Sequence, residues 1–145
     1  KKESTSELIG KLSSKGIICN ITAIFTINHI KEVLGILDKS TPAILSIFAG
    51  RIADTGIDPY KIITESVNLA ESKPNSEILW ASTREILNVF QAEEVGCQII
   101  TVPHDLLEKM SNVGKDLEEF SLETVHDFYT DALSAGYKIK LKDEI

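Results

Sequence analysis

Residues 18–25 read ICNITAIF and residues 43–50 read AILSIFAG, two short apolar runs with the length of buried β-strands. Two more runs of this kind lie at residues 77–82 and 98–102. After each run, apolar side chains recur at spacings of three and four, which is the period of an amphipathic helix. The patterns therefore predict one helix, four strand–helix units and a final helix. Strands that alternate with helices in this way form a parallel sheet with right-handed crossovers.

Capping residues set the expected limits of several helices. The helix after the third strand is expected to open with the capping-box sequence STRE at residues 82–85 and to stop at Gly96. Ser82 would then be its N-cap. A longer amphipathic helix is expected from about Leu117 to Ala135.

Two architectures satisfy this order of elements: an open doubly wound sheet, or half of an eight-stranded (β/α)8 TIM-type barrel, whose usual length is about 250 residues. Periodicity does not choose between them. Polar groups gather at the carboxyl end of the strands in a barrel, and polar residues of this chain fall there. We therefore expect an α/β fold in which the chain supplies about four βα units of a barrel plus a C-terminal helix. Residues 1–145 are expected to form a single domain.

Composition and charge narrow the class of protein. The chain carries 15 basic and 22 acidic side chains, a net charge of −7 and no basic block, so nucleic acid is not an expected partner. No run of 18 apolar residues occurs, so a membrane is not expected either. The two cysteines, Cys19 and Cys97, are too few to staple the domain, which fits a reducing cytoplasm. The three histidines, His29, His104 and His126, have no second ligand at metal spacing, so neither a metal nor another cofactor is expected.

The first two strands carry polar residues among apolar ones. Asn20 and Thr22 are two apart and therefore share one face of their strand, where an amide and a hydroxyl would be buried together. They either satisfy backbone and cross-strand groups or bind a ligand. For a Thr in a strand the structural role is the usual one. Asn is depleted in strands and costs about 1–3 kcal/mol if it is left unpaired in a core, so for Asn20 the two roles stay equally open. Ser46, Phe48 and Gly50 share a face of the second strand in the same way.

Two arginines follow the ends of strands. Arg51 is either a solvated loop charge paired with Asp54 or, if it faces the mouth of the strands, a fork for phosphate or carboxylate. Arg84 is expected in the first turn of a helix, where acidic residues are usual, and an anion shared with the helix N–H groups would explain it. Ser82 is either a plain N-cap or a further contact to that anion. Thr101, at the end of the fourth strand, is interpreted as a residue of the turn that leads into the next helix, without a ligand role.

Four segments in order resemble the transaldolase family. The segment GIICNITAIF at 16–25 resembles the strand whose Asn and Thr line the active site, and SIFAGRI at 46–52 resembles the next strand, with Ile47 in place of the proline often found there. WASTR at 80–84 is similar to the family's Ala-Ser-x-Arg segment. ITVP at 100–103, followed by Asp105-Leu106-Leu107, resembles its final strand and helix. Together these segments cover residues 20 to 110.

The resemblance implies a class I mechanism. A lysine attacks the ketose carbonyl, the Schiff base serves as an electron sink for C–C cleavage, and a three-carbon dihydroxyacetone unit passes between sugar phosphates of the pentose phosphate pathway. It also implies roles for the residues. Arg51, Ser82 and Arg84 would hold the phosphate of a sugar-phosphate substrate, and Phe48 would shape the pocket wall. Asn20, Thr22 and Ser46 would bind sugar hydroxyls or the catalytic water.

The Schiff-base lysine of the family belongs to a strand that would precede Asn20, and the sequence does not supply it. Lys1 and Lys2 stand in a polar, charged stretch, so we do not expect them to have the burial that makes a lysine nucleophilic. We therefore expect this chain alone to be inactive and to need the remaining N-terminal half of the barrel or another subunit, in a homo-oligomer. Three interpretations stay open: a transaldolase whose amino-terminal half lies elsewhere, a non-catalytic sugar-phosphate-binding half-barrel, and an assembly piece without a ligand. A fructose 6-phosphate aldolase-type lyase is not separated from a transaldolase.

Overall fold

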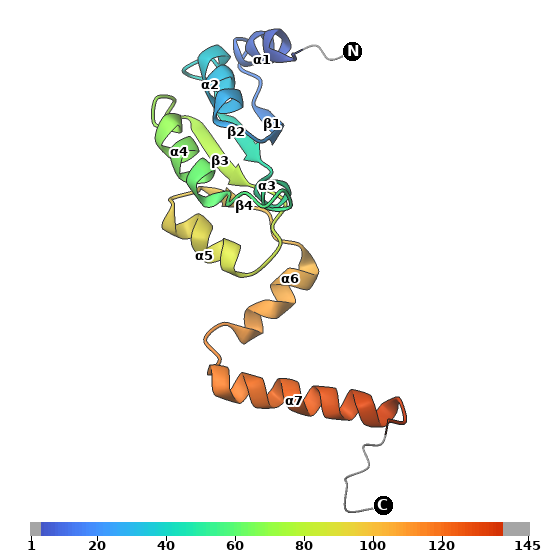
Figure 1. Cartoon of the computed structure of the whole chain (residues 1–145). Helices are drawn as coiled ribbons and strands as arrows, with labels where there is room; N and C mark the ends of the chain where they lie inside the picture. Colours follow the sequence, from blue (N-terminus) through green and yellow to red (C-terminus); the bar gives the residue numbers. More distant parts are fainter. Residues whose placement is uncertain (1–3, 138–145) are drawn as a thin grey trace, which may run out of the picture. The chain divides into compact units, whose positions relative to one another are not determined.

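Residues 4–137 are described by a computed structural model (Figure 1). Four strands alternate with helices, as the sequence predicts. In chain order the elements are α1 (Ser6–Ser13), β1 (Cys19–Ile24), α2 (Ile27–Ile36), β2 (Ala43–Ile47), α3 (Ala49–Ala53), α4 (Tyr60–Ala70), β3 (Ser76–Trp80), α5 (Leu87–Glu94), β4 (Ile99–Ile100), α6 (His104–Glu108), the 3-10 helix η1 (Lys109–Asn112) and α7 (Leu117–Ser134).

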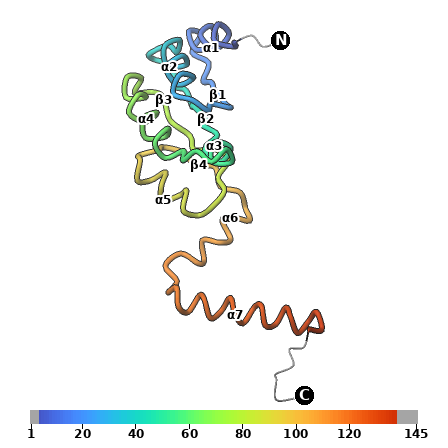
Figure 2. The backbone as a smooth tube through the Cα atoms, viewed as in Figure 1, coloured from blue at the N-terminus to red at the C-terminus, as the bar shows by residue number. Residues whose placement is uncertain are grey.

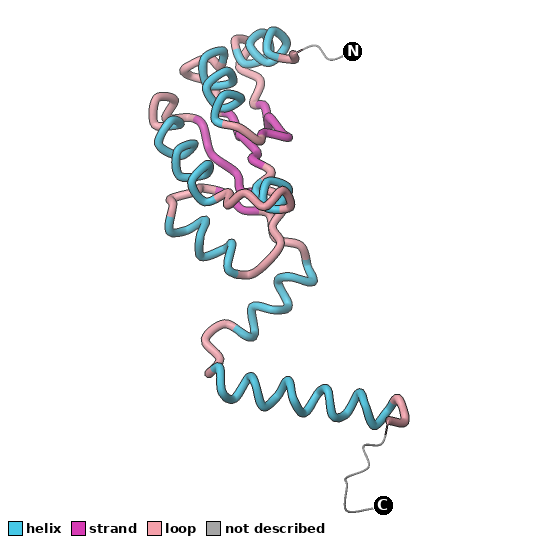
Figure 3. Tube along the Cα trace, viewed as in Figure 1, coloured by secondary structure: helices cyan, strands magenta, loops and turns pink. Residues whose placement is uncertain are grey.

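The four strands form one parallel sheet in the order β1-β2-β3-β4 (Figure 3). Each strand lies beside the next one in sequence, and the order does not reverse. A doubly wound sheet needs such a reversal, where the chain switches direction along the sheet. The order therefore agrees with consecutive strands of a barrel, although the described strands do not close on themselves.

One face of the sheet is covered by helices and carries the core. Leu45, Ile47, Ile78 and Trp80 of the two central strands are fully buried there. Helices α2, α4 and α5 pack on this face through apolar side chains of the same cluster, among them Ile30, Val33, Leu34, Ile63 and Ala92. In the tube view, α2 and α4 follow the same side of the strands (Figure 2). The opposite face takes the alternate residues of each strand. It carries the polar Asn20, Ser46 and Glu77 together with the apolar Ile44 and Leu79.

Two expected boundaries are wrong, and both lie at the ends of strands. The second strand ends at Ile47, and Gly50 and Arg51 belong to the short helix α3 rather than to the strand. The helix after β3 begins at Leu87, so residues 82–85 form a loop and not its first turn. The other predicted elements are confirmed with ends that shift by a few residues.

The contacts divide the chain into two compact units, Lys1–Met110 and Ser111–Ile145. Within the second unit, the Asp116 carboxylate caps α7 by accepting hydrogen bonds from the backbone N–H groups of Glu118 and Glu119. Helix α7 agrees with the predicted range, and none of its residues is buried. The single-domain interpretation of residues 1–145 stays a prediction. Among the described residues, no helix is both long and apolar enough to cross a membrane.

Candidate functional site

Asn20 and Ser46 meet across β1 and β2. The Ser46 hydroxyl donates a 2.6 Å hydrogen bond to the Asn20 side-chain oxygen. Ser46 is buried, but Asn20 and Thr22 are exposed, so the expectation that they are buried together is wrong. The reason is that β1 is an edge strand of the described sheet. Because its oxygen is already paired with Ser46, Asn20 offers its amide N–H groups to a ligand.

The carboxyl end of β1 is irregular. The register with β2 shifts between Ile21 and Ile24, and Ala23 has a φ of 59°. A left-handed backbone is rare for a residue with a Cβ, and such residues cluster at functional sites. Thr22 lies within this irregular stretch, so the backbone at this candidate residue departs from a regular strand.

Phe48 links the end of β2 to the helix that carries Arg51. Its ring lies 5.9 Å from the ring of Phe25, centroid to centroid, at the end of β1. The Arg51 guanidinium lies over the same ring, 5.3 Å from its centroid, within the range of a cation–π contact. The Phe48 ring therefore contacts both Phe25 and Arg51, and its role as a pocket wall stays a prediction.

Gly50 brings the second and third strand ends together. A Cβ built on Gly50 would lie 1.6 Å from the carbonyl oxygen of Ser82 and 2.9 Å from Cγ of Arg84. The Gly50 N–H also points at the Ala81 carbonyl, 3.4 Å away. Only a residue without a side chain permits this approach. The start of α3 is thus pressed against the loop that carries Ser82 and Arg84.

Arg84 is paired with a carboxylate, and Arg51 is not. Arg84 Nη2 lies 2.7 Å from Asp54 Oδ2, with both side chains about half exposed. Of the two alternatives for Arg51, the pair with Asp54 is therefore wrong, because Arg84 takes that carboxylate. Within the described residues, Arg51 has no carboxylate partner. An exposed pair of this kind stabilises by about 0.2–1 kcal/mol.

Ser82 is not an N-cap, contrary to expectation. Its φ of 63° places it in the left-handed region, and its hydroxyl makes no hydrogen bond to any described residue. The backbone N–H groups of Arg84 and Glu85 instead donate to the Asn88 side-chain oxygen, at 3.1 and 3.2 Å. An anion could not use those two N–H groups without displacing Asn88. The expected sharing of an anion between Arg84 and the N–H groups of a helix N-terminus is therefore wrong, and only the Arg84 side chain is left for such a contact.

Sequence reasoning missed Asn88 and the contacts of Gly50 and Asp54, because each is set by the path of a loop. The Gly-Arg-Ile segment at 50–52 was the one sequence feature that pointed to the contact of Gly50.

We call Arg51, Ser82 and Arg84 the arginine corner. The two arginines are the only ones in the chain, and the contacts of Gly50 and Asp54 place both of them around α3. Thr101, by contrast, is exposed at the end of β4 and makes no side-chain contact to this group among the described residues.

A second polar cluster ties α1 to α2. The Glu32 carboxylate accepts hydrogen bonds from the hydroxyls of Ser4, at 3.0 Å, and of Ser6. These hydroxyls, Ser6 first, lower the pKa of Glu32. The cluster borders a cavity of about 130 Å³ that Thr22 and His29 also line.

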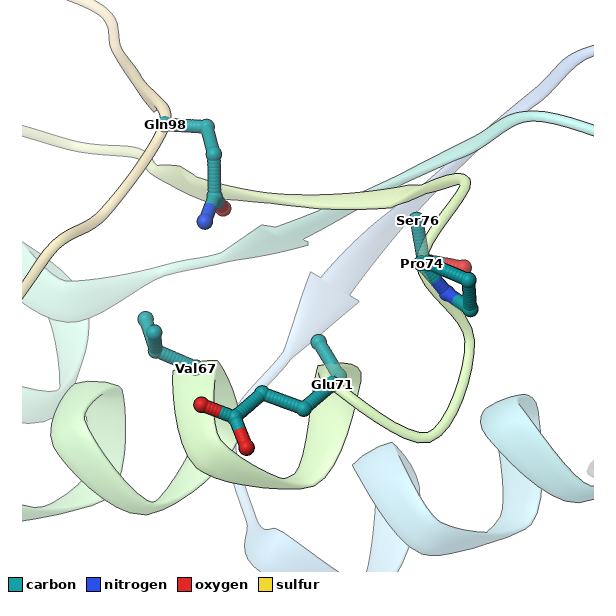
Figure 4. A pocket seen from close by; sticks show the side chains of 6 residues that line it. Val67, Glu71, Pro74, Ser76 and Gln98 are labelled. Carbon is teal, nitrogen blue, oxygen red and sulfur yellow. The ribbon is translucent and has the colours of Figure 1, made fainter.

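A larger cavity of about 370 Å³ lies at the other end of the strands (Figure 4). It is lined by Val67, Ala70, Glu71, Pro74, Ser76 and Gln98. The Gln98 side chain already accepts from Ile78 N–H and donates to the Gly96 carbonyl. None of the predicted site residues lines this cavity. Across residues 4–137, no group of three His, Cys, Asp or Glu side chains is placed to hold a metal.

Among the described residues, the groups that this site presents are hydrogen-bond donors and cations. It offers two cations, a free hydroxyl and an amide, which suit an anionic, hydroxylated ligand. No lysine lies on β1 to β4. Lys1 and Lys2 lie outside the described residues, so the expectation about them stays a prediction.

Comparison with known proteins gives one family. The sequence model of the family described as Transaldolase/Fructose-6-phosphate aldolase matches residues 3–142. A probable transaldolase of Nitrosopumilus maritimus is 34% identical over 101 residues, 68% of this chain and 44% of that protein. One of Dehalococcoides mccartyi is 35% identical over 105 residues, 72% of this chain and 47% of that protein. One of a Thermoanaerobacter strain is 33% identical over 132 residues, 90% of this chain and 57% of that protein. The chain spans about half the length of the curated relatives it matches.

Proposed function

Since the chain belongs to the transaldolase/fructose-6-phosphate aldolase family, we propose that it forms the sugar-phosphate-binding part of a transaldolase-type transferase. The enzyme moves a dihydroxyacetone unit between sugar phosphates of the pentose phosphate pathway in the cytoplasm. The Schiff-base lysine comes from outside the described strands. It is carried by an amino-terminal half of the barrel or by another subunit of a homo-oligomer.

One observation carries the proposal: the chain's only two arginines and Ser82 gather around α3, where Gly50 touches the Ser82 carbonyl and the Arg84 side chain. A phosphate ester has three acceptor oxygens, and two guanidinium groups with a free hydroxyl can supply donors to each of them. The neighbouring β1 and β2 hold Asn20 and Ser46 as a hydrogen-bonded pair. That pair is suited to sugar hydroxyls or to a water that takes part in proton transfer.

In this proposal, the chain's own residues bind and orient the substrate. Arg51 and Arg84 fix the phosphate, and Phe48 forms the wall beside Arg51. Asn20, Ser46 and Thr22 hold the hydroxyl end. There the lysine amine adds to the ketose carbonyl, and the carbinolamine so formed loses the carbonyl oxygen as water to give the Schiff base. Binding at the distant phosphate positions the reacting carbon, so loss of an arginine reduces the rate as well as affinity.

Trapping with borohydride in the presence of fructose 6-phosphate, followed by intact mass, tests the proposal. It is done on this chain and on a longer form that includes the preceding strands. A covalent adduct is expected on the longer form, and Arg51→Ala is expected to reduce it strongly. Lys31→Ala, which changes an exposed cation of α2, is the matched control. If the longer form gives no adduct, or if Arg51→Ala leaves it unchanged, the transferase proposal is contradicted.

The second candidate is a fructose 6-phosphate aldolase-type lyase, which is favoured by the description of the matching family, because it covers both activities. Both form the same Schiff base, so the trapping experiment does not separate them. Release of free dihydroxyacetone without an aldehyde acceptor indicates the lyase. Dependence of turnover on a phosphorylated aldose acceptor indicates the transferase.

A third candidate, a non-catalytic sugar-phosphate-binding half-barrel, is favoured by the absence of lysine from the described strands. It predicts that sugar phosphates stabilise the protein against unfolding while neither form gives an adduct.

A further inference from the structure

Asp54 lies beside the arginine corner, although a site that binds phosphate does not need a carboxylate. It follows the last residue of α3, three residues after Arg51, and its N–H donates to the Gly50 carbonyl at 3.0 Å. Gly50 is the residue that meets Ser82. The Asp54 backbone is therefore fixed to the same contact that assembles the corner, and its carboxylate is directed at Arg84.

The two arginines are consequently unequal in the free protein. Arg84 donates to Asp54 at 2.7 Å, whereas Arg51 rests on the Phe48 ring without a carboxylate among the described residues. Arg84 and Asp54 keep 53% and 57% of their side-chain surface exposed, so an anion from solution can reach the pair. One cation of the corner is thus neutralised, and the other is available.

We propose that Asp54 is a built-in competitor for Arg84, which an incoming phosphate has to displace, and that it thereby lowers the affinity of the corner for free phosphate. The inference rests on the proposed sugar-phosphate site and deepens it. Asp54 weakens the phosphate contact, so the corner holds inorganic phosphate less tightly than it would without this carboxylate. Retention of a substrate then depends on its sugar contacts at Asn20 and Ser46.

The alternative is that Asp54 positions Arg84 for the phosphate and so strengthens binding. Two effects decide between these roles. An exposed, salt-screened ion pair restrains a long side chain only weakly, so the gain from positioning is small. A carboxylate beside the guanidinium also repels a phosphate dianion and takes an N–H group that the phosphate needs. Competition is therefore the larger effect.

Titration with inorganic phosphate, followed through the arginine side-chain Nε–Hε signals, tests the inference. The chain has two arginines, so Arg51→Ala and Arg84→Ala assign both signals. Asp54→Asn is expected to shift the Arg84 signal without ligand and to tighten phosphate binding by roughly fivefold, the effect of one exposed charge contact. Glu65→Gln is the matched control, because the Glu65 side chain is about as exposed as that of Asp54. Its carboxylate, on α4, pairs with Lys31 of α2 at 3.8 Å.

A double-mutant cycle separates competition for Arg84 from direct repulsion. The gain from Asp54→Asn should shrink by at least half in the Arg84→Ala background. Weaker or unchanged phosphate binding in Asp54→Asn overturns the inference while leaving the sugar-phosphate site intact. A gain of equal size in the Arg84→Ala background also overturns it. If neither the wild type nor Asp54→Asn binds phosphate, the site itself fails. If Asp54→Asn binds phosphate and the wild type does not, the inference is supported most strongly.

Discussion

The α-carbon of Gly50 faces the carbonyl oxygen of Ser82 so closely that a Cβ at position 50 would lie 1.6 Å from that oxygen. This contact joins the end of β2 to the end of β3 and places Arg51 and Arg84 around one short helix. Because the obstructing atom belongs to the backbone, a side chain at position 50 cannot be accommodated by a change of rotamer. The phosphate site that we propose depends on this junction.

Gly50→Ala is expected to destabilise the protein by roughly 1–3 kcal/mol, the range for an overpacked site, and to weaken phosphate binding. Unfolding in urea measures the first effect, and phosphate titration of the folded fraction measures the second. Gly35→Ala in α2 is the matched control, since nothing lies within 4 Å of its Cβ position. That control should be neutral or stabilising by about 0.5 kcal/mol. Equal effects of the two substitutions would argue against the junction.

Ser82 combines a strained backbone with a free hydroxyl, and two substitutions separate these properties. Ser82→Gly relieves the left-handed φ of 63° and should stabilise the protein by about 1 kcal/mol. Ser82→Ala keeps the strain and should leave stability nearly unchanged. Thermal unfolding measures both. The two variants should lose phosphate affinity to a similar extent, because each lacks the hydroxyl. Full affinity in Ser82→Ala would remove Ser82 from the site.

The pairing of Glu32 with Ser4 and Ser6 predicts a pH-dependent contribution to stability. The pKa of Glu32 is lowered in the folded protein, so its contribution is present above the pKa of the unfolded chain, about 4.3. It is lost as the pH falls through the folded value. Urea unfolding should therefore show Glu32→Gln less stable than wild type at pH 7, with the difference closing as the pH falls below the pKa of the unfolded chain and through the lowered folded pKa. A difference that is constant with pH would contradict this, as would one that persists when Ser4 and Ser6 are both alanine.

The order of elements was predictable from sequence because buried strands and amphipathic helices have different apolar periods. ICNITAIF at 18–25 and AILSIFAG at 43–50 both contain strands of the parallel sheet. Strand ends were less predictable. Ala49 and Gly50 were expected at the end of the second strand but belong to α3, because the chain has to turn at the junction with Ser82. That junction depends on a contact between residues 32 positions apart.

The candidate residues were found from their position after strands, but their partners were not. The capping-box spacing at Ser82 predicts a helix start. Instead, Ser82 adopts a left-handed backbone and Asn88 accepts the N–H groups that an N-cap would serve. Similarly, Asp54 is nearer in sequence to Arg51 and yet pairs with Arg84. The spacing of residues in the sequence predicts which side chains lie at the carboxyl ends of the strands. The path of the loops decides which of these side chains contact each other.

The central claim is that Arg51 and Arg84 bind one phosphate together. Titration of the protein with fructose 6-phosphate, followed through its two arginine Nε–Hε signals, tests this claim most directly. Both signals should shift and saturate with the same dissociation constant, and either arginine-to-alanine substitution should weaken binding by tenfold or more, about 1.4 kcal/mol. Signals that stay unmoved, or that titrate with two different constants, would show that the two guanidinium groups do not share an anion.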